Sequence, residues 1–347
     1  KDPQARIQAL QPYLSDTRYV SIQIGIGGFR PMSAEEVYRN KYGDCKALSN
    51  YMMSLLKACD IPSNYTEIGM GEQSTLGTFV HPGYTNHVIL QVPIAKDTLW
   101  VECTNPDIPL GYVHSGISGR NALVIKDGSA YLARVPSYPD SIQLSLVKAH
   151  IIINPEANAS SDVSLTNHMQ RYEPLIGFSK LDLRNKSDYL MRVSEQIPME
   201  KINNIQSTEH KTASPSIHIS YELKFPLQRS GNRLLVPAFP VRENKVQRLS
   251  ASRTSDICIE KGFRNKDTIE FALPSNCKLE SLPESIRLES KFGKYTTQIK
   301  VIGNKILCCR DWLMYSGKYP LNDYPDFKAF MERIKEDNLS KVILISR

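Results

Sequence analysis

The stretch YGDCKALSNYMMSLLKAC, residues 42–59, constrains the fold of this chain more than any other part of it. Asp44 is a good helix N-cap, and Gly43 allows the chain to bend tightly just before it. Pro62 ends the helix shortly afterwards. The sequence therefore predicts a compact helix of about four turns with Cys45 in its first turn. Its apolar residues recur at helical spacing: Leu48, Tyr51, Met52, Leu55, Leu56 and Cys59.

The predicted position of Cys45 favours a reactive thiol. The first turn of a helix carries unpaired N–H groups and the positive end of the helix dipole, and both favour thiolate over thiol. Thiolate is the form that attacks a carbonyl carbon, so Cys45 is a candidate nucleophile. The alternative is that Cys45 is a small buried apolar residue, as free cysteines often are.

Two segments downstream predict an antiparallel hairpin. Residues 87–92 and 98–103 read HVILQV and TLWVEC and are joined by a short turn. Alternation along the strands places Trp100 and Glu102 on one face of the second strand. His87 and Glu102 then lie near the same end of the hairpin, opposite or diagonal to one another, within the reach of a glutamate side chain.

A cysteine at a helix start, a histidine opening a strand and a carboxylate on the neighbouring strand fit one chemistry. The thiolate of Cys45 attacks an amide or ester carbonyl, and His87 transfers the proton. Glu102 holds the imidazole in the required tautomer. The sequence therefore predicts a Cys-His-Glu triad.

These residues resemble the transglutaminase-like superfamily of papain-like cysteine hydrolases, and in particular its bacterial multidomain branch with a Gly-Asp-Cys-Lys motif. The resemblance covers residues 15–135, and it implies Cys45 as nucleophile, His87 as base and Glu102 as the third member, where Asp is the commoner residue. It rests on Tyr42-Gly43-Asp44-Cys45-Lys46, Asn86-His87-Val88, Trp100-Val101-Glu102-Cys103-Thr104 and the upstream Phe29-Arg30-Pro31.

Five further residues are weaker candidates around the triad. In papain-like sites a donor upstream of the cysteine often completes the oxyanion hole, and Gln23 is the candidate here. Asp44 positions the helix start as its cap. Trp100 is expected in the core or in the wall of the substrate cleft, and Tyr84 and Asn86 are also candidates for lining that cleft.

Two alternatives to catalysis stay open at this stage. Metal binding is the first, but the spacing of the candidate ligands matches no zinc pattern, and we predict no metal and no cofactor. The second is a catalytically inactive papain-like module that binds a partner through the loop at residues 71–86, which is rich in Gly, Ser and Thr. The metal-ligand candidates are Cys45, Cys59, His81, His87 and Cys103.

The cluster of Pro and turn-forming residues at 135–140 predicts a domain boundary. We expect an α+β protein with a papain-like domain over residues 1–140 and a β-rich, antiparallel sandwich-like domain over residues 141–347 that carries a terminal helix. In the first domain we expect helices at 5–14 and 33–40 and strands at 19–26, 64–69 and, as a pair, 122–135. In the second we expect a hairpin at 144–153 and 159–170, a helix at 172–195, short strands from 201 to 310, a helix at 326–338 and a strand at 341–346.

The chain of 347 residues is 41% apolar and 23% charged, ordinary values for a soluble globular protein. No apolar run is long enough to span a bilayer. Residues 1–144 carry 12 Lys and Arg against 13 Asp and Glu, and the remainder carries 31 against 23. These cations are scattered and form no stripe, so we expect no nucleic-acid partner.

The expected partner is therefore a peptide or protein substrate. Hydrolysis is preferred over cross-linking, because transamidation needs a site at which an amine outcompetes water and the sequence identifies none. The resemblance also implies export to the periplasm or the cell surface, with a signal peptide and an N-terminal β-domain that are absent from this chain. The oligomeric state is not predicted.

Overall fold

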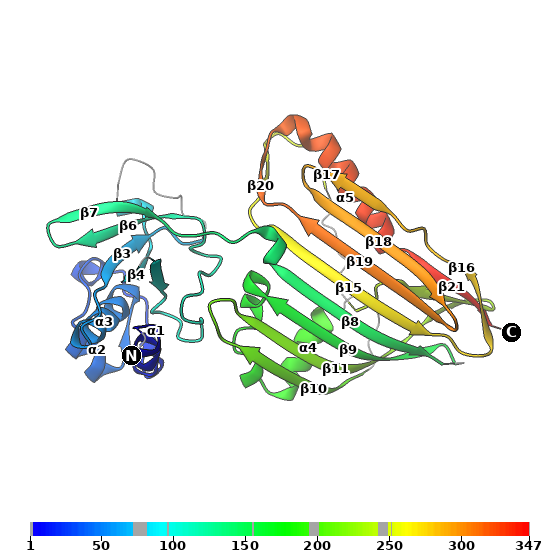
Figure 1. The fold of residues 1–347 in the computed structure, drawn as a ribbon, viewed down its shortest axis with the longest axis horizontal. Coiled ribbons are helices and arrows are strands. Elements are labelled where there is room, and N and C mark those ends of the chain that lie inside the picture. The colour runs from blue at the N-terminus through cyan, green and yellow to red at the C-terminus, as the bar shows by residue number, and fades with distance from the viewer. Residues whose placement is uncertain are drawn as a thin grey trace. The chain divides into compact units, whose positions relative to one another are not determined.

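The computed structural model describes residues 3–71, 82–95, 97–154, 156–193, 201–241, 249–250 and 252–346. The chain divides into two compact units, an N-terminal unit of Lys1–Tyr138 with Lys211–Pro215 and a C-terminal unit of Pro139–His210 with Ser216–Arg347. The division falls between Tyr138 and Pro139, inside the stretch rich in turn-forming residues. Both units combine helices with strands, and the fold is α+β (Figure 1).

The N-terminal unit contains three α-helices and a five-stranded antiparallel sheet of order β5-β4-β3-β6-β7. The helices are α1 (Pro3–Ser15), α2 (Ala34–Asn40) and α3 (Cys45–Ala58). The strands are β1 (Arg18–Tyr19), β2 (Tyr42–Gly43), β3 (Asn64–Ile68), β4 (His87–Ile94), β5 (Asp97–Val101), β6 (Asn121–Lys126) and β7 (Ser129–Arg134). Short 3-10 turns lie at Gly25–Gly28 and Pro82–Tyr84.

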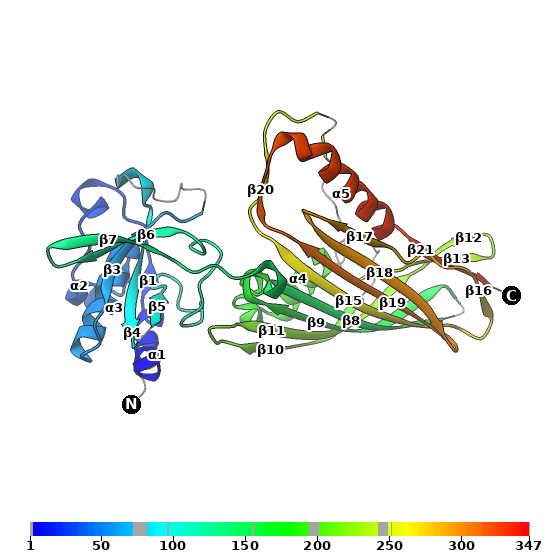
Figure 2. The ribbon, with the colours of Figure 1, turned by 45° about the horizontal axis from the view of Figure 1, so that its top comes forward.

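Strand β4 is buried on both faces, which explains its continuous apolar sequence. On one face Leu90 and Val92 pack with the apolar sides of α1, α2 and α3 (Figures 1 and 2). On the other face Ile89 packs with Trp100 of β5 and with Ile117, which lies in the segment that follows β5. The predicted hairpin of β4 and β5 is confirmed, and its position at the centre of the unit fixes the place of His87.

Helix α3 also forms as the sequence predicts. Its N-cap is Asp44, whose carboxylate accepts a hydrogen bond from the Ala47 N–H at 2.9 Å. A Cβ on Gly43 would lie 2.8 Å from the Ala47 Cβ, closer than Cβ atoms approach other atoms in proteins. Glycine is therefore required where the chain enters the helix, and Cys45 becomes the first helical residue.

The predicted strand at residues 19–26 is wrong for most of its length. Only Arg18–Tyr19 pairs, in parallel with Tyr42–Gly43 of β2. The alternating Ile24 and Ile26 that suggested a strand are 90% and 76% exposed. Gly25, with a φ of 64°, starts a 3-10 turn between them. An alternating pattern predicts a strand only where a neighbouring strand supplies hydrogen bonds, and the last backbone hydrogen bond to β2 in the described structure is that of the Val20 N–H to the Gly43 carbonyl.

The C-terminal unit is built on an eight-stranded sheet of order β10-β11-β9-β8-β15-β19-β18-β17 and a four-stranded sheet of order β12-β13-β21-β16. Its helices are α4 (Leu183–Val193) and α5 (Tyr324–Asn338). The strands of the larger sheet are β8 (Leu144–Ile153), β9 (Asn158–His168), β10 (Lys201–His210), β11 (Ser216–Pro226), β15 (Phe263–Ala272), β17 (Arg287–Ser290), β18 (Gly293–Ile302) and β19 (Lys305–Met314). The other strands are β12 (Gln228–Ser230), β13 (Arg233–Pro237), β14 (Ile257–Ile259), β16 (Cys277–Ser281), β20 (Gly317–Tyr319) and β21 (Lys341–Ser346).

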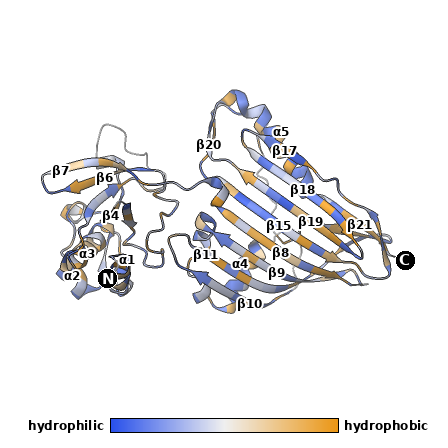
Figure 3. Cartoon of the chain, viewed as in Figure 1, coloured by the Kyte–Doolittle hydropathy of each residue, from blue (hydrophilic) through white to orange (hydrophobic). Residues whose placement is uncertain are grey.

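Apolar and polar residues alternate along the strands of the larger sheet (Figure 3). Its apolar face shares one core with β13, β21 and α4. Helix α5 packs through Phe327 and Phe330 against Phe292 and Tyr295, at the edge formed by β17 and β18 (Figures 1 and 2). All pairs in this sheet are antiparallel except β8 with β15, which is parallel.

The helix predicted at residues 172–195 is shorter than expected. Two 3-10 turns, at Glu173–Leu175 and Phe178–Lys180, replace its first half, and α4 begins only at Leu183. Pro174 limits the first turn, and Gly177, with a φ of 80°, separates the two. Residues 194 and 195 lie outside the described residues. Among the helices that the structure describes, none is long and apolar enough to cross a bilayer.

Candidate active site

The structure brings the three predicted triad residues to one place. Cys45 is the first residue of α3, His87 is the first residue of β4, and Glu102 directly follows β5. The register that pairs Leu90 with Val101 makes Glu102 a diagonal neighbour of His87. The His87 Nε2 lies 2.8 Å from the Glu102 Oε2. All three residues are less than 9% exposed.

The hydrogen bonds of His87 define how its ring is oriented. Since Nε2 donates to Glu102, Nδ1 is the ring nitrogen left to face Cys45. Burial alone lowers the pKa of His87, but hydrogen bonds to Cys45 and Glu102 outweigh burial and raise the pKa to about 10. The imidazole is therefore held in its protonated form at neutral pH.

Glu102 is held by four hydrogen bonds. Its Oε1 accepts from the Thr104 N–H at 2.8 Å and from the Thr104 hydroxyl at 2.5 Å. Its Oε2 faces the Nε2 atoms of both His87 and His114. Burial raises the pKa of Glu102, but the hydrogen bonds from His114 and His87 dominate and hold the pKa well below its usual range. The longer glutamate side chain is therefore fixed as a carboxylate in spite of its extra methylene.

His114 is a site residue that the sequence analysis missed. Its Nε2 lies 3.2 Å from the Glu102 Oε2, and its Nδ1 accepts a hydrogen bond from the Gly116 N–H at 3.2 Å. Because Nδ1 accepts, the proton lies on Nε2, which donates to the carboxylate. His114 lies in the irregular segment between β5 and β6, where no periodicity connects it with Glu102. Only the tertiary structure brings the two side chains together.

Cys45 and His87 line a cavity of about 250 Å³. Gln23 and Asn86 line it as well, while Trp100 and Tyr84 are not among the described residues that do. Trp100 is 5% exposed and lies in the core of the sheet, which is the first of the two places expected for it. Tyr84 is 39% exposed. The full lining is Gln23, Gly28, Phe29, Cys45, Lys46, Glu67, Thr85, Asn86, His87 and Val88.

Gln23 and Asn86 differ in how firmly they are held. The Gln23 amide is exposed and donates to the Ser21 hydroxyl at 3.1 Å. The Asn86 side chain accepts from the Met70 N–H at 2.7 Å and donates to the Met70 carbonyl at 3.1 Å. These two hydrogen bonds link Asn86, the residue directly before His87, to the segment that follows β3. The Ser21 bond uses one of the two N–H donors of the Gln23 amide.

Asp44 and Lys46 form an ion pair beside the nucleophile. Asp44 is 2% exposed, and its other carboxylate oxygen caps α3. The Lys46 ammonium also lies 3.4 Å from the Ile22 carbonyl oxygen. The charge of Lys46 is therefore compensated within the protein, and the pair fixes the first turn of the helix that carries Cys45.

The cysteines and histidines do not assemble a metal site in the part of the chain that the structure describes. His81, one of the candidate ligands, lies outside the described residues. All seven cysteines are free. Cys103 is buried, and burial raises the pKa of its thiol well above the usual range. A buried thiol with a raised pKa is unreactive, so we expect Cys103 to be inert. Cys45, by contrast, lies beside an imidazole.

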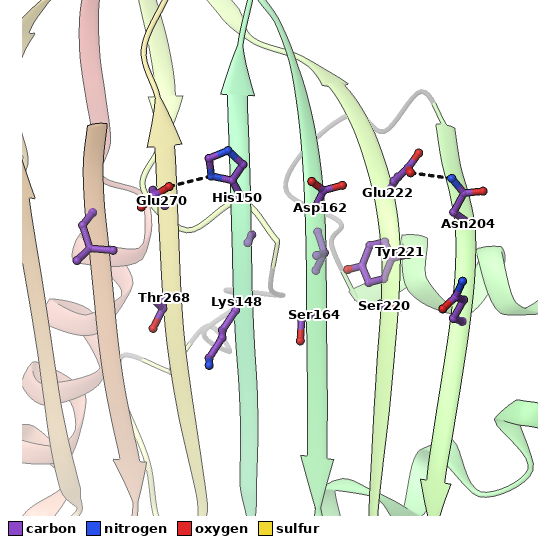
Figure 4. Close-up of a pocket in the computed structure, with 14 residues that line it drawn as sticks. Lys148, His150, Asp162, Ser164, Asn204, Ser220, Tyr221, Glu222, Thr268 and Glu270 are labelled. Atoms are coloured by element: carbon purple, nitrogen blue, oxygen red, sulfur yellow. Dashed lines mark hydrogen bonds and ion pairs between the residues drawn. The ribbon is translucent and has the colours of Figure 1, made fainter. Parts of the chain in front are cut away.

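A second, larger cavity of about 680 Å³ lies on the polar face of the eight-stranded sheet. Figure 4 shows its side chains in two rows that cross the strands. His150 and Glu270 pair at 2.9 Å, and Asn204 donates to Glu222 at 2.7 Å. These four groups form two separate pairs, whereas the smaller cavity contains a thiol and an imidazole. We therefore place the candidate active site in the smaller cavity.

Comparisons with known proteins match part of the chain to a family and nearly all of it to a known fold. Residues 232–344, in the C-terminal unit, match the family model of a domain of unknown function, DUF3858. Among solved structures, the chain is similar to a protein from Parabacteroides distasonis described as a "putative protease", with a TM-score of 0.56 and 12% sequence identity. The similarity covers 99% of this chain and 52% of that protein, so this chain spans about half of its length. No curated protein matches the chain.

Proposed function

We propose that this protein is a cysteine-dependent hydrolase of amide or peptide bonds, with a papain-like, transglutaminase-like N-terminal unit. Cys45 is the nucleophile, His87 the base and Glu102 the residue that orients the base. One observation carries the proposal: Glu102 binds the His87 Nε2 at 2.8 Å, which turns the other ring nitrogen towards a cysteine at a helix N-terminus inside a cavity. The similarity to a protein described as a "putative protease" supports the same general class.

The geometry suggests a sequence of steps. The Cys45 sulfur attacks the substrate carbonyl, and the oxyanion that forms is stabilised by the Cys45 N–H at the start of α3, with Gln23 as a second donor. His87 gives its proton to the leaving amine, which departs and leaves an acyl group on the sulfur. His87 then takes a proton from water, whose oxygen attacks this thioester and releases the acid and the Cys45 thiolate, so that His87 is again protonated. Glu102 stays ionised throughout.

The reactivity of Cys45 tests the proposal directly. Iodoacetamide near pH 7 should label Cys45 before Cys59 or Cys103, and His87→Ala should slow labelling of Cys45 by at least tenfold, as expected for loss of the ion pair. Peptide mapping by mass spectrometry gives the rate at each cysteine. Equal rates at all three cysteines in the wild type would overturn the assignment of the nucleophile.

The same experiment tests the alternative function, a catalytically inactive papain-like module that binds a partner. That function needs no activated thiol, so it predicts ordinary labelling of Cys45 and no effect of His87→Ala. Hydrolysis of a mixed peptide library, with Cys45→Ala as control, then separates an active hydrolase from a protein with a merely reactive thiol. Products that form equally with Cys45→Ala would contradict the proposed function.

We also keep export as a proposal, because the relatives implied by the sequence resemblance are often exported. Fractionation of cells that express the full-length protein checks it. Recovery in the periplasmic or surface fraction is the expected result, and recovery with the cytoplasmic markers contradicts it.

A further inference from the structure

Glu67 places a carboxylate in the wall of the candidate active-site cavity. It lies on β3, pairs with Val88 of β4 and lines the same cavity as Cys45 and His87. The Thr85 hydroxyl donates to its Oε2 at 3.2 Å. The carboxylate and the reacting sulfur thus line one cavity.

No cation of the described protein neutralises this carboxylate. Lys46 supplies the one ammonium group among the described residues of the cavity wall, and that group pairs with Asp44. His87, the other cationic group there, binds Glu102. Within the described residues Glu67 therefore has a hydroxyl partner but no ion pair. A carboxylate in a partly enclosed site attracts positive charge more strongly than one in open water.

We propose that Glu67 binds a cationic group of the substrate, so that the substrate is an amide or peptide with an ammonium or guanidinium group beside the scissile bond. Phe29, which lines the same cavity and is 84% exposed, offers its ring to the aliphatic part of such a group and to its charge. The inference rests on the proposed function, because it assumes that the substrate carbonyl is placed at Cys45.

Three small alkylating reagents of different charge test this inference without knowledge of the substrate. They are 2-bromoethylammonium, neutral iodoacetamide and anionic iodoacetate, each with its rate at Cys45 divided by its rate with N-acetylcysteinamide. The ratio between the cationic and the anionic reagent at one pH does not depend on the fraction of Cys45 that is thiolate. That ratio therefore reports the local charge alone.

Glu67→Gln removes the charge and keeps an acceptor for Thr85. We expect this variant to lower the cation-to-anion ratio about tenfold, the effect of one charge at close range in a partly shielded site. Glu67→Asp should stay near the wild type, and Glu67→Lys should lower the ratio further. Asp127→Asn, in the exposed turn between β6 and β7, changes the net charge equally and should have no effect.

The outcomes separate this inference from the proposed function. A ratio that is the same in the wild type, Glu67→Gln and Glu67→Lys, with Cys45 still labelled first, overturns the role of Glu67 and leaves the hydrolase intact. A Cys45 that reacts no faster than Cys59 with any reagent overturns the proposed function itself. Circular dichroism confirms the fold of each variant, and the ratio of Glu67→Gln to Glu67→Asp decides the question if Glu67→Lys is unfolded.

Discussion

The Nε2 of His114 lies 3.2 Å from the same Glu102 oxygen that binds His87 at 2.8 Å, so one carboxylate oxygen serves two imidazoles. Thr104 occupies the other oxygen. The third member of the triad is thus fixed from three directions. This arrangement explains how a glutamate can orient His87 although its side chain has one more rotatable bond than aspartate.

His114→Phe should weaken the triad without removing a member of it. Loss of a hydrogen bond to a buried carboxylate costs about 1.5–3 kcal/mol, so labelling of Cys45 by iodoacetamide should slow by roughly tenfold or more. The pH range over which Cys45 reacts fast should also narrow. Glu102 then binds His87 less firmly and raises the pKa of His87 less. His114→Gln keeps a donor and should restore much of the rate. Identical profiles for both variants and the wild type would reduce His114 to a packing residue.

Glu102→Gln should keep the fold, because the amide preserves the hydrogen-bonding shape, but should lower the activity of the triad by up to about 10⁴-fold. The charge that stabilises protonated His87 is lost in this variant. Glu102→Asp should do less harm, since it keeps the charge. The measurement is the pH dependence of Cys45 alkylation in all three proteins, and coincident curves would remove Glu102 from the mechanism.

The stability of the N-terminal unit should depend on the protonation of His87. The pKa of His87 is raised from 6.5 to about 10 in the folded protein. The imidazole therefore keeps a proton in the folded state that it releases above pH 6.5 in the unfolded state. The contribution of His87 to stability is thus full below that pH and is lost as the pH rises towards 10.

Urea unfolding between pH 6.5 and pH 10 measures this dependence. The chain has two tryptophans, Trp100 in the N-terminal unit and Trp312 in the C-terminal unit, so Trp312→Phe makes Trp100 fluorescence a reporter of the N-terminal unit. His87→Gln in that background should remove most of the slope. A stability that rises with pH in this window would contradict the protonated state of His87.

Gly43→Ala should disturb both stability and reactivity. The added Cβ would lie 2.8 Å from the Ala47 Cβ, so the first turn of α3 must shift. Overpacking of this kind costs about 1–3 kcal/mol. Cys45 labelling should slow as well, because its sulfur moves with the turn. Gly128→Ala, in the exposed β6–β7 turn, has open space around the added Cβ and is the control for reactivity. A normal Cys45 rate in Gly43→Ala would show that the first turn of α3 tolerates the methyl group.

In the C-terminal unit, Asp267→Ala should be strongly destabilising. Arg310 donates to the Asp267 carboxylate at 2.6 Å and to the Asn338 side chain at 2.7 Å, and both charged side chains are 1% exposed. Removing one partner of a buried pair costs about 3–5 kcal/mol. Trp312 fluorescence during urea unfolding measures the loss. Glu280→Gln, which breaks the exposed pair with Arg233, should have little effect.

Local sequence signals predicted the elements that carry the triad, because each depends on neighbours in the chain. Asp44 caps α3 three residues before Ala47, and the β4–β5 hairpin closes over a short turn. The same signals failed where a long-range partner decides the outcome. The alternating residues 19–26 predicted a strand, but only the start of this segment pairs with a neighbour, and Gly177 separates two 3-10 turns where one helix was predicted.

The residues that complete the site could not be predicted for the same physical reason. His114 reaches Glu102 from an irregular segment, and Glu67 reaches the cavity from a strand whose local sequence does not determine which face meets that cavity. The resemblance to a known family supplied roles only for positions inside its motif. The charge of Glu67 in the cavity wall and the hydrogen bond from His114 to Glu102 both arise only in the folded chain.

The parallel pairing of β8 with β15 has a consequence for synthesis of the protein. Residues 144–153 and 263–272 form adjacent central strands of one sheet, although the ribosome makes them far apart in time. Until β15 emerges, β8 is an open edge that can pair with another chain. The DUF3858 match begins at residue 232, so the part of the chain that this family defines supplies β15 while the preceding part supplies β8. Neither part completes the sheet alone, and a nascent chain stalled before residue 263 should be retained by chaperones or aggregate.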